Sequence, residues 1–315
     1  TGLWSLVSGS GSIISVNSGS TVISNLGVGV NVFQWATSNG ICPASVSTVT
    51  ITRDDFPDAA LAGADQLICS TSATLSANSA TTGTGQWSLL SGAAFFSAPL
   101  NPQTQVSGLG LGMNVFAWTI SNGVCPPSTD TVSVTRDGFP DAAVAGVSQT
   151  LCGASAQLNA NIPQTGNGYW TVLLPGPVVL SPSDALSGVS GLNEGDNQFV
   201  WTITNGVCTP SADTVSLYSY ALPSQADAGT DQQVCGTTAT LQAMLPAKGT
   251  GSWQSPVNGN IVNMTSANTV VNAMTDGTHY FIWKVENGIC PVSVDSLQMK
   301  VFIPPGQAQA GPDQQ

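Results

Sequence analysis

Hydrophobic and polar positions alternate most clearly around residue 118, where Phe116, Trp118 and Ile120 are separated by smaller or polar residues. A period of two residues is typical of a β-strand that buries one face. Asn122-Gly123 follows directly, and this dipeptide favours a type I′ turn, in which both central residues have a positive φ. The stretch therefore predicts the first strand and the turn of a β-hairpin.

The same hairpin pattern occurs four times along the chain. It occupies Asn31–Cys42, Asn114–Cys125, Asn197–Cys208 and, in a changed form, His279–Cys290. Two series of tryptophans recur at a nearly constant interval: Trp35, Trp118, Trp201 and Trp283, and Trp4, Trp87, Trp170 and Trp253. A unit of about 83 residues can bury its own core and fold alone, which a solenoid repeat of about 30 residues cannot. We therefore expect separate domains arranged like beads on a string.

The spacing divides the 315 residues into a partial unit, three complete units and the start of another. These are residues 1–55, 56–138, 139–221, 222–303 and 304–315, and the first four are called the first to fourth repeats below. In each complete repeat a linker rich in Pro, Asp and Ala precedes about seven strand-like stretches, the number typical of a β-sandwich. No amphipathic stretch with a helical period is present. The sequence predicts an all-β array of tandem sandwiches whose first member lacks its first strands.

Both ends of the sequence fall inside repeats. Thr1–Trp4 aligns with Thr84–Trp87, and Ala310–Gln315 aligns with Ala228–Gln233. We expect residues 1–315 to be an internal segment of a longer polypeptide, with secretion and anchoring signals elsewhere. No apolar run approaches the roughly 20 residues that a membrane helix requires, so this segment is not expected to insert into a membrane.

Charged residues make up only 7% of the chain, and the net charge is −12. Binding of nucleic acid requires basic residues to neutralise phosphates, and the chain has five in total, so this class of partner is excluded. A hydrophobic content of 42% indicates a folded chain despite the low charge.

The seven cysteines occupy two positions of the repeat. Pairing within repeats gives Cys69–Cys125, Cys152–Cys208 and Cys235–Cys290 and leaves Cys42 over. Pairing across the linkers gives Cys42–Cys69, Cys125–Cys152 and Cys208–Cys235 and leaves Cys290 over. A pair across a linker is expected to lie two strand lengths apart, roughly 50 Å, whereas a disulfide requires Cα atoms within about 7 Å. We therefore expect structural disulfides within each repeat.

Such a disulfide would stabilise its repeat considerably. Closing a loop of about 57 residues, as Cys69–Cys125 would, stabilises a domain by about 4 kcal/mol in the chain-entropy model. Disulfides also indicate an oxidising compartment. Zinc is the alternative use of these cysteines, but the chain has no Cys-x-x-Cys and a single histidine.

Three further sets of residues are candidates for function. The tryptophan pairs are expected to be core residues, with a sugar-stacking surface as the alternative. Calcium at the junctions between domains is a second alternative, because carboxylates are its natural ligands and aspartates flank the linkers: Asp54, Asp55, Asp58 and Asp65, and Asp227 and Asp231.

Catalysis has little support, because His279 replaces the asparagine of the other copies and no phosphate-binding glycine loop precedes a helix. We expect no enzymatic activity and no bound cofactor.

Several short motifs resemble a known group of repeats. Ala62–Cys69 reads Ala-Gly-x-Asp-Gln-x-x-Cys, followed by Ala-Thr-Leu-x-Ala at 73–77 and Gly-x-Trp at 85–87. Phe116–Val134 then reads Phe-x-Trp-x-Ile-x-Asn-Gly-x-Cys-x-x-x-x-Asp-Thr-Val-x-Val. This order resembles the tandem PKD-like and Ig-like repeats of Bacteroidetes cell-surface proteins, among them gliding-motility adhesins. The resemblance covers the whole chain and implies Ig-like sandwiches, export by type IX secretion and a place at the cell surface.

We expect a structural stalk segment of a long extracellular adhesin or filament, which provides reach and mechanical stability. Its partners are expected to be neighbouring repeats of the same chain, with surface glycans or further copies as candidates. Two alternatives remain from the sequence: a polysaccharide-binding module, and a spacer attached to a secreted multidomain enzyme.

Overall fold

The computed structural model of the protein describes residues 1–254 and 259–311, and within them it contains β-strands and no α-helix. No helix able to cross a membrane occurs in that part of the chain. Two compact units are formed, one by Thr1–Phe139 with Gly206–Cys208 and the other by Pro140–Asn205 with Thr209–Gln315. The expected start of a further repeat at 304–315 lies partly outside the described residues.

The second repeat shows the sandwich most clearly. One sheet has the order β6 (Gln66–Ile68), β12 (Ser128–Arg136), β11 (Gly112–Ser121) and β8 (Thr84–Ser91). The other has the order β7 (Ser72–Ser76), β10 (Gln103–Ser107) and β9 (Phe95–Phe96). Two sheets with this division of strands form an Ig-like sandwich, with β8, β11 and β12 in the places of strands C, F and G. The predicted fold class is confirmed.

The third and fourth repeats have the same two sheets. In the third, β13 (Gln149–Cys152), β19 (Ser211–Tyr220), β18 (Gly195–Thr204) and β15 (Asn167–Val172) face β14 (Ser155–Gln157), β17 (Gly188–Ser190) and β16 (Val178–Val179). In the fourth, β20 (Gln232–Cys235), β26 (Ser293–Phe302), β25 (Gly277–Glu286) and β22 (Thr250–Gln254) face β21 (Ala239–Gln242), β24 (Asn268–Asn272) and β23 (Asn260–Ile261).

The first repeat has a shorter set of strands. Its larger sheet is β1 (Gly2–Ser8), β4 (Gly29–Thr37) and β5 (Ser45–Arg53), and its smaller sheet is β2 (Ser12–Ile13) and β3 (Ile23–Ser24). Among the described residues, nothing corresponds to β6 and β7 of the second repeat.

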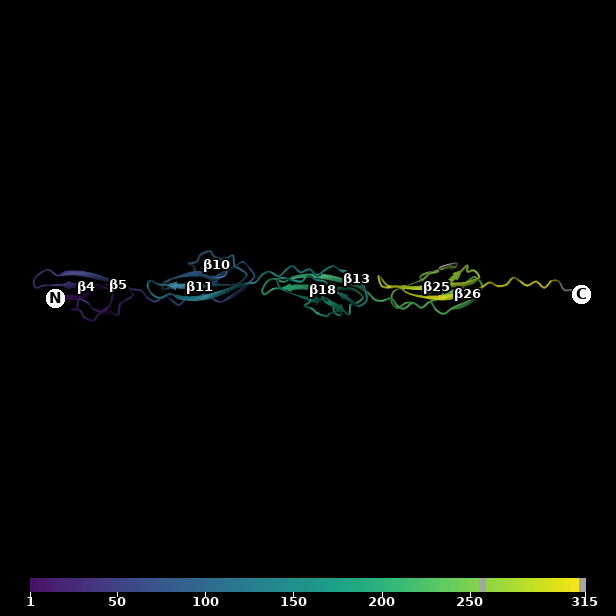
Figure 1. The fold of residues 1–315 in the computed structure, drawn as a ribbon, viewed down its shortest axis with the longest axis horizontal. Coiled ribbons are helices and arrows are strands. Elements are labelled where there is room, and N and C mark those ends of the chain that lie inside the picture. The colour runs from purple at the N-terminus through teal and green to yellow at the C-terminus, as the bar shows by residue number, and fades with distance from the viewer. Residues whose placement is uncertain (255–258, 312–315) are drawn as a thin grey trace. The chain divides into compact units, whose positions relative to one another are not determined.

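The alternating face of β11 fills the core of the second repeat. Phe116, Trp118 and Ile120 are buried and pack against Leu75 and Val106 of the opposite sheet. Figure 1 labels these layers as β11 and β10. Truncation of one such large side chain typically lowers the free energy of unfolding by about 3–5 kcal/mol. Burial of the alternating face of β11 therefore supplies much of the stability of the sandwich.

The linker residues belong to the core as well. Ala60 and Ala62 are buried, and their N–H groups donate to Ser128 Oγ at 2.9 Å and to Asp130 Oδ2 at 2.7 Å. The same contact to an aspartate recurs in the other complete repeats, from Ala145 to Asp213 and from Ala228 to Asp295, at 2.8 Å each. The linker predicted from the sequence therefore packs against the strands of the repeat that it precedes.

The turn after β11 differs from the predicted type I′ turn. Cys125 N donates to Asn122 O at 3.2 Å, so Gly123 and Val124 are the central residues of the turn. Gly123 has a φ of +56°, whereas the described non-glycine residues with positive φ are Asn25 and Ala273 alone. A positive φ at the first central position only is typical of a type II′ turn. The prediction of positive φ at the asparagine is wrong, because the asparagine precedes the central pair.

Candidate functional site at the junction of consecutive repeats

The turn of the second repeat contacts the end of the first repeat within the first compact unit. Asp54, directly after β5, accepts a hydrogen bond from Val124 N at 3.0 Å through Oδ2. Asn122 Nδ2 donates to Asp55 O at 2.9 Å. The side chain of the turn asparagine and the backbone of the turn therefore both bind the chain that leaves the preceding repeat.

Glycine is required in this turn for two reasons. Its φ of +56° lies in the left-handed region, which L side chains rarely adopt. A Cβ atom at Gly123 would also lie 1.7 Å from Asp54 Oδ2. The close approach of the carboxylate to the turn thus depends on the absence of a side chain.

The equivalent contact in the second compact unit uses a different side chain. Asn287 Nδ2 donates to Ala221 O at 2.8 Å, as Asn122 does to Asp55 O. Tyr220 occupies the place of Asp54, and its ring lies against Gly288, where a Cβ atom would be 2.3 Å from the ring. The asparagine contact is kept while the carboxylate is replaced by an aromatic ring.

A disulfide joins Cys69 to Cys208, with the Cα atoms 5.1 Å apart. Cys208 belongs to the first compact unit together with Gly206 and Val207. Beside it, Asp137 Oδ2 accepts a hydrogen bond from Val207 N at 3.1 Å, the same contact that Asp54 makes to Val124. The bond therefore connects the earlier cysteine of one repeat with the later cysteine of the next.

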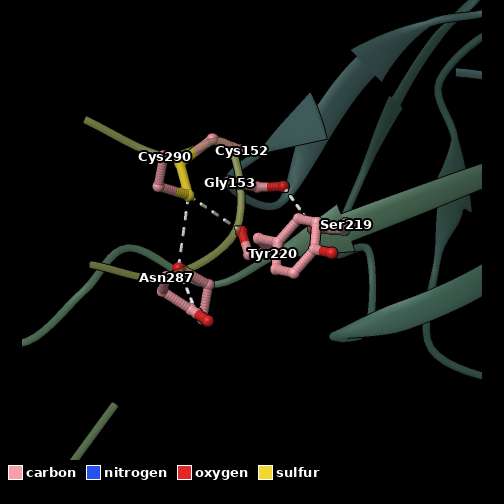
Figure 2. Close-up of a disulfide and its surroundings, with 7 residues drawn as sticks. Cys152, Gly153, Ser219, Tyr220, Asn287 and Cys290 are labelled. Atoms are coloured by element: carbon pink, nitrogen blue, oxygen red, sulfur yellow. Dashed lines mark hydrogen bonds between the residues drawn. A yellow bond between two sulfur atoms is a disulfide. The ribbon is translucent and has the colours of Figure 1, made fainter. Parts of the chain in front are cut away.

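A second disulfide joins Cys152 to Cys290, with the Cα atoms 5.0 Å apart. Figure 2 shows it beside Tyr220 and Asn287, and Ser219 Oγ donates to Gly153 O at 2.7 Å next to the bond. The sulfur of Cys290 lies 3.3 Å from Ala221 O. Both disulfides thus sit where a turn meets the end of the preceding repeat.

The predicted pairs within repeats, Cys69–Cys125, Cys152–Cys208 and Cys235–Cys290, are wrong. The cause is the direction of β6, which pairs parallel to the end of β12, with Ile68 opposite Arg136. Cys69 therefore lies at the far end of β12, whereas Cys125 precedes its start, and the nine residues of β12 put them about 30 Å apart. The alternative pairs across the linkers are not formed either in the part of the chain that the structure describes.

Among the described residues, three cysteines carry no disulfide. Cys42 and Cys235 are exposed, and Cys125 is half-buried with its sulfur 3.7 Å from Asp54 O. Cys125 holds the position of Cys208 and Cys290, and Cys235 holds the position of Cys69 and Cys152. Each of the three therefore occupies a position of the repeat at which a cysteine of another repeat forms a disulfide.

The aspartates considered for calcium bind backbone groups. Asp58 accepts hydrogen bonds from the Thr81 hydroxyl and from the N–H groups of Thr81 and Thr82, and these bonds lower its pKa. Asp65 accepts from Ser133 N at 2.8 Å, which lowers the pKa of Asp65. Asp54 bonds to the turn as described above.

The remaining calcium candidates also have local partners. Asp55 lies 3.9 Å from Arg53, Asp231 accepts from Gln298 N at 2.9 Å, and Asp227 accepts from Gly229 N at 2.9 Å. Across residues 1–254 and 259–311, no three His, Cys, Asp or Glu side chains gather closely enough to hold a metal ion. These aspartates are accounted for as acceptors that order turns and linkers.

The tryptophans of the second, third and fourth repeats lie in the core, as expected. The pairs of the second, third and fourth repeats are buried, and each pair has its ring centroids 5.0–5.1 Å apart: Trp87–Trp118, Trp170–Trp201 and Trp253–Trp283. Trp4 and Trp35 of the first repeat are partly exposed. In the three complete repeats the rings are therefore not arranged as a sugar-stacking surface.

His279 holds the position of a buried asparagine. Asn114 Nδ2 donates to Gly110 O, Gly112 O and Val134 O at 3.0–3.2 Å, and its Oδ1 accepts from Ala93 N at 3.0 Å. His279 is buried in the fourth repeat, with Nε2 2.8 Å from Thr275 O. His279 therefore has the same structural role as the asparagine of the other repeats: it bonds to the backbone carbonyl four residues before it.

Sequence reasoning missed the junction contacts of Asn122, Asp137 and Tyr220, and it considered Asp54 only for calcium. A signal was available, because positions 54, 137 and 220 recur at the interval of the repeat, directly after its last strand. The parallel register of β6 on β12, on which the disulfide pairing depends, could not be predicted from the sequence.

No family model matches the chain, and no curated protein matches it. Among solved structures, the chain is similar to Sidekick-1 immunoglobulin domains 1–5 at 13% identity, with 96% of this chain and 74% of that chain covered and a TM-score of 0.39. It is similar to the Drosophila OTK extracellular domains 3–5 at 10% identity, with 80% and 98% covered and a TM-score of 0.39. Similarity to the PKD domain from the KIAA 1837 protein is 22% identity over 28% of this chain and 94% of that chain, with a TM-score of 0.24. Similarity at this level assigns no function to the chain.

Proposed function

We propose that this chain is a non-catalytic, load-bearing segment of a long extracellular adhesin or filament. The observation that carries the proposal is the overlap of its two disulfides along the sequence. Cys69–Cys208 spans 139 residues and Cys152–Cys290 spans 138, and Cys152 falls inside the first loop while Cys290 falls outside it. Overlapping loops shorten the covalent path through the chain more than either bond does alone.

The shortest covalent path from Cys69 to Cys290 crosses both bonds. It runs from Cys69 to Cys208, back along the third repeat to Cys152, and across to Cys290. At about 3.4 Å per extended residue, this path of about 56 residues stretches to about 190 Å. Without disulfides, the path of about 221 residues stretches to about 750 Å. Under force, the extension of the oxidised chain therefore increases little even when its sandwiches unfold.

The turn contacts support the same function. Asn122 and Asp54 connect the first and second repeats through hydrogen bonds. The linker is therefore not the sole connection between the two repeats at this junction. The residue ranges 56–138, 139–221 and 222–303 are the units that we propose to be repeated along the longer protein.

An extracellular location follows from the same bonds, because disulfides persist in oxidising compartments. The resemblance of the repeats to those of Bacteroidetes surface proteins supports attachment at the cell surface, export by type IX secretion and, more specifically, a part in gliding-motility adhesins. The proposed partners are neighbouring repeats of the same polypeptide.

A single-molecule force measurement tests the load-bearing role. Handles at residues 1 and 315 are pulled in buffer with and without a thiol reductant, and the maximum extension is compared. We expect the reduced chain to extend further by about 560 Å, the difference between the two path lengths. Equal maximum extension in both conditions would contradict the proposal.

A further inference from the structure

The contact between consecutive repeats depends on the amide group of a turn asparagine. Asn122 Nδ2 donates to Asp55 O in the first compact unit, and Asn287 Nδ2 donates to Ala221 O in the second. Both asparagines are half-buried, so solvent reaches part of each side chain. An ionised aspartate at either position would have no N–H group to donate to the carbonyl of the preceding repeat.

The residue after each asparagine must be glycine. Gly123 and Gly288 both have a φ of +56°. A Cβ atom at Gly123 would lie 1.7 Å from Asp54 Oδ2, and one at Gly288 would lie 2.3 Å from the ring of Tyr220. The junction therefore requires an amide donor that is followed directly by a residue without a side chain.

Asparagine followed by glycine is the dipeptide that loses ammonia most readily, because glycine leaves its own main-chain nitrogen unhindered. In this reaction the nitrogen of Gly123 gives up its proton to solvent and attacks Cγ of Asn122. The new N–Cγ bond closes a five-membered succinimide, the Cγ–Nδ2 bond breaks, and Nδ2 takes up a proton and leaves as ammonia. Water then opens the succinimide to aspartate or isoaspartate, so the only co-reactant is water.

The junction contact opposes this reaction. Attack on Cγ requires the amide of Asn122 to turn toward Gly123 N, whereas the bond to Asp55 O holds the amide nitrogen on the preceding repeat. The amide of Asn287 is held in the same way, by Ala221 O. The asparagine therefore reacts most readily while its turn is separated from the preceding repeat.

At the first junction, the product opposes the return of the turn. A carboxylate at position 122 has no donor for Asp55 O, and it lies one residue from Gly123, against which the Asp54 carboxylate packs. Like charges at such short range destabilise each other. Isoaspartate in addition lengthens the main chain of the turn by one carbon atom.

The junction of the second compact unit also has a carboxylate beside its asparagine. Hydrogen bonds from Lys248 and Asn287 lower the pKa of Glu194, so this carboxylate is charged at neutral pH. Figure 2 shows Asn287 beside Tyr220 at this junction. Loss of ammonia from Asn287 would remove a donor to Glu194 and place a second negative charge there.

We propose that Asn122 and Asn287 are modification sites at which deamidation is controlled by the junction. The reaction proceeds when a turn separates from the preceding repeat, and the carboxylate that it leaves disfavours renewed contact. Because ammonia is released, the change is irreversible and marks a junction that has opened. A covalent mark of this kind goes beyond the load-bearing role.

The rate of deamidation in the whole oxidised chain tests this control. The chain is incubated in mildly alkaline buffer, and the product at each asparagine is quantified over time by mass spectrometry of digests. Two variants each weaken one junction and leave every Asn-Gly dipeptide in place. Asp54→Ala removes the acceptor of Val124 N, and Tyr220→Ala removes the ring that lies against Gly288.

We expect Asp54→Ala to accelerate deamidation of Asn122 roughly tenfold, since a hydrogen bond to a charged group stabilises the closed junction to that extent. Its effect on Asn287 is expected to be absent. Tyr220→Ala is expected to show the reverse selectivity, so each variant is the control for the other. Asn167-Gly168 is an internal control, because this Asn-Gly dipeptide begins strand β15 and makes neither contact.

The effect of the product is tested with Asn122→Asp. We expect this variant to lower the hydrogen-exchange protection of the Val124 amide about tenfold. Asn287→Asp makes the same change at the other junction and is expected to leave the Val124 amide as in the native chain.

The proposal is overturned if neither junction variant accelerates deamidation of its own asparagine, or if Asn122→Asp retains native protection of the Val124 amide. Equal acceleration at Asn122, Asn287 and Asn167 would mean that the reaction follows general unfolding, which also contradicts control by the junction. No force is applied and both disulfides stay intact, so this inference and the load-bearing role can fail independently.

Discussion

At the scale of single residues, the two tryptophans of a pair have different hydrogen bonding. Trp87 Nε1 donates to Pro102 O at 3.2 Å, whereas Trp118 Nε1 is buried and has no acceptor among the described residues. Replacement of Trp118 by phenylalanine removes an unsatisfied donor, whereas replacement of Trp87 removes one of the two hydrogen bonds to Pro102 O, which also accepts from Ala77 N at 3.0 Å. We expect Trp87→Phe to cost the second repeat about 1 kcal/mol more than Trp118→Phe. Hydrogen exchange at Val132 and Val134 measures the difference, and equal costs would contradict it.

The buried asparagine of the second repeat provides another comparison. Asn114 is fully buried and its side chain bonds five backbone groups, so Asn114→Ala leaves several of them without this partner in the core. We expect a loss of about 3 kcal/mol in the free energy of unfolding of this repeat. The matched change in the fourth repeat, His279→Asn, restores the residue found in the other copies, and we expect it to cost less than about 1 kcal/mol. The reverse order in hydrogen-exchange protection would refute this role.

Much at this scale was predictable from the sequence. The strand period identified Phe116, Trp118 and Ile120 as core residues, because the burial of one strand face depends on local alternation alone. The hydrogen-bond partners of Asn122 were not predictable, because they lie in the preceding repeat and depend on where that chain ends.

At the scale of elements, the parallel pairing of β6 with β12 decides the disulfides. The sequence predicts a short strand ending at Cys69 but not the strand beside which it lies, since a strand of three residues carries little information on its neighbour. The sequence analysis weighed pairs within a repeat and pairs across a linker, and it did not consider a bond from the earlier cysteine of one repeat to the later cysteine of the next. Long elements with an alternating pattern were predictable, and the placement of the short ones was not.

The turn of the second repeat is the element that we expect to be most sensitive to substitution. Gly123 and Gly40 have nearly the same φ, +56° and +59°, but a Cβ atom has open space at Gly40 and meets Asp54 at Gly123. Both Gly→Ala changes strain the backbone equally, so the difference between them reports the contact with the preceding repeat. We expect Gly123→Ala to lower the hydrogen-exchange protection of the Val124 amide by at least tenfold. Gly40→Ala is expected to leave that amide unchanged, and a loss of protection in both variants would argue against the contact.

At the scale of the whole molecule, the overlap of the two disulfides makes the effect of removing one bond calculable. With Cys152→Ala, the shortest path from Cys69 to Cys290 crosses the Cys69–Cys208 bond and then follows about 82 residues, or about 280 Å when extended. With Cys69→Ala, it follows about 83 residues before the Cys152–Cys290 bond, which gives about the same length. We therefore expect either variant to extend about 90 Å further than the native chain in a force measurement.

Cys125→Ala is the matched control for this measurement, because Cys125 forms no disulfide in the structure. It leaves both bonds in place, and we expect its maximum extension to equal that of the native chain. If the bonds lay within repeats instead, loss of Cys125 would lengthen the path as much as loss of Cys69, since both would break the same bond. An extension of Cys125→Ala beyond that of the native chain would therefore contradict the connection between repeats on which the load-bearing role depends.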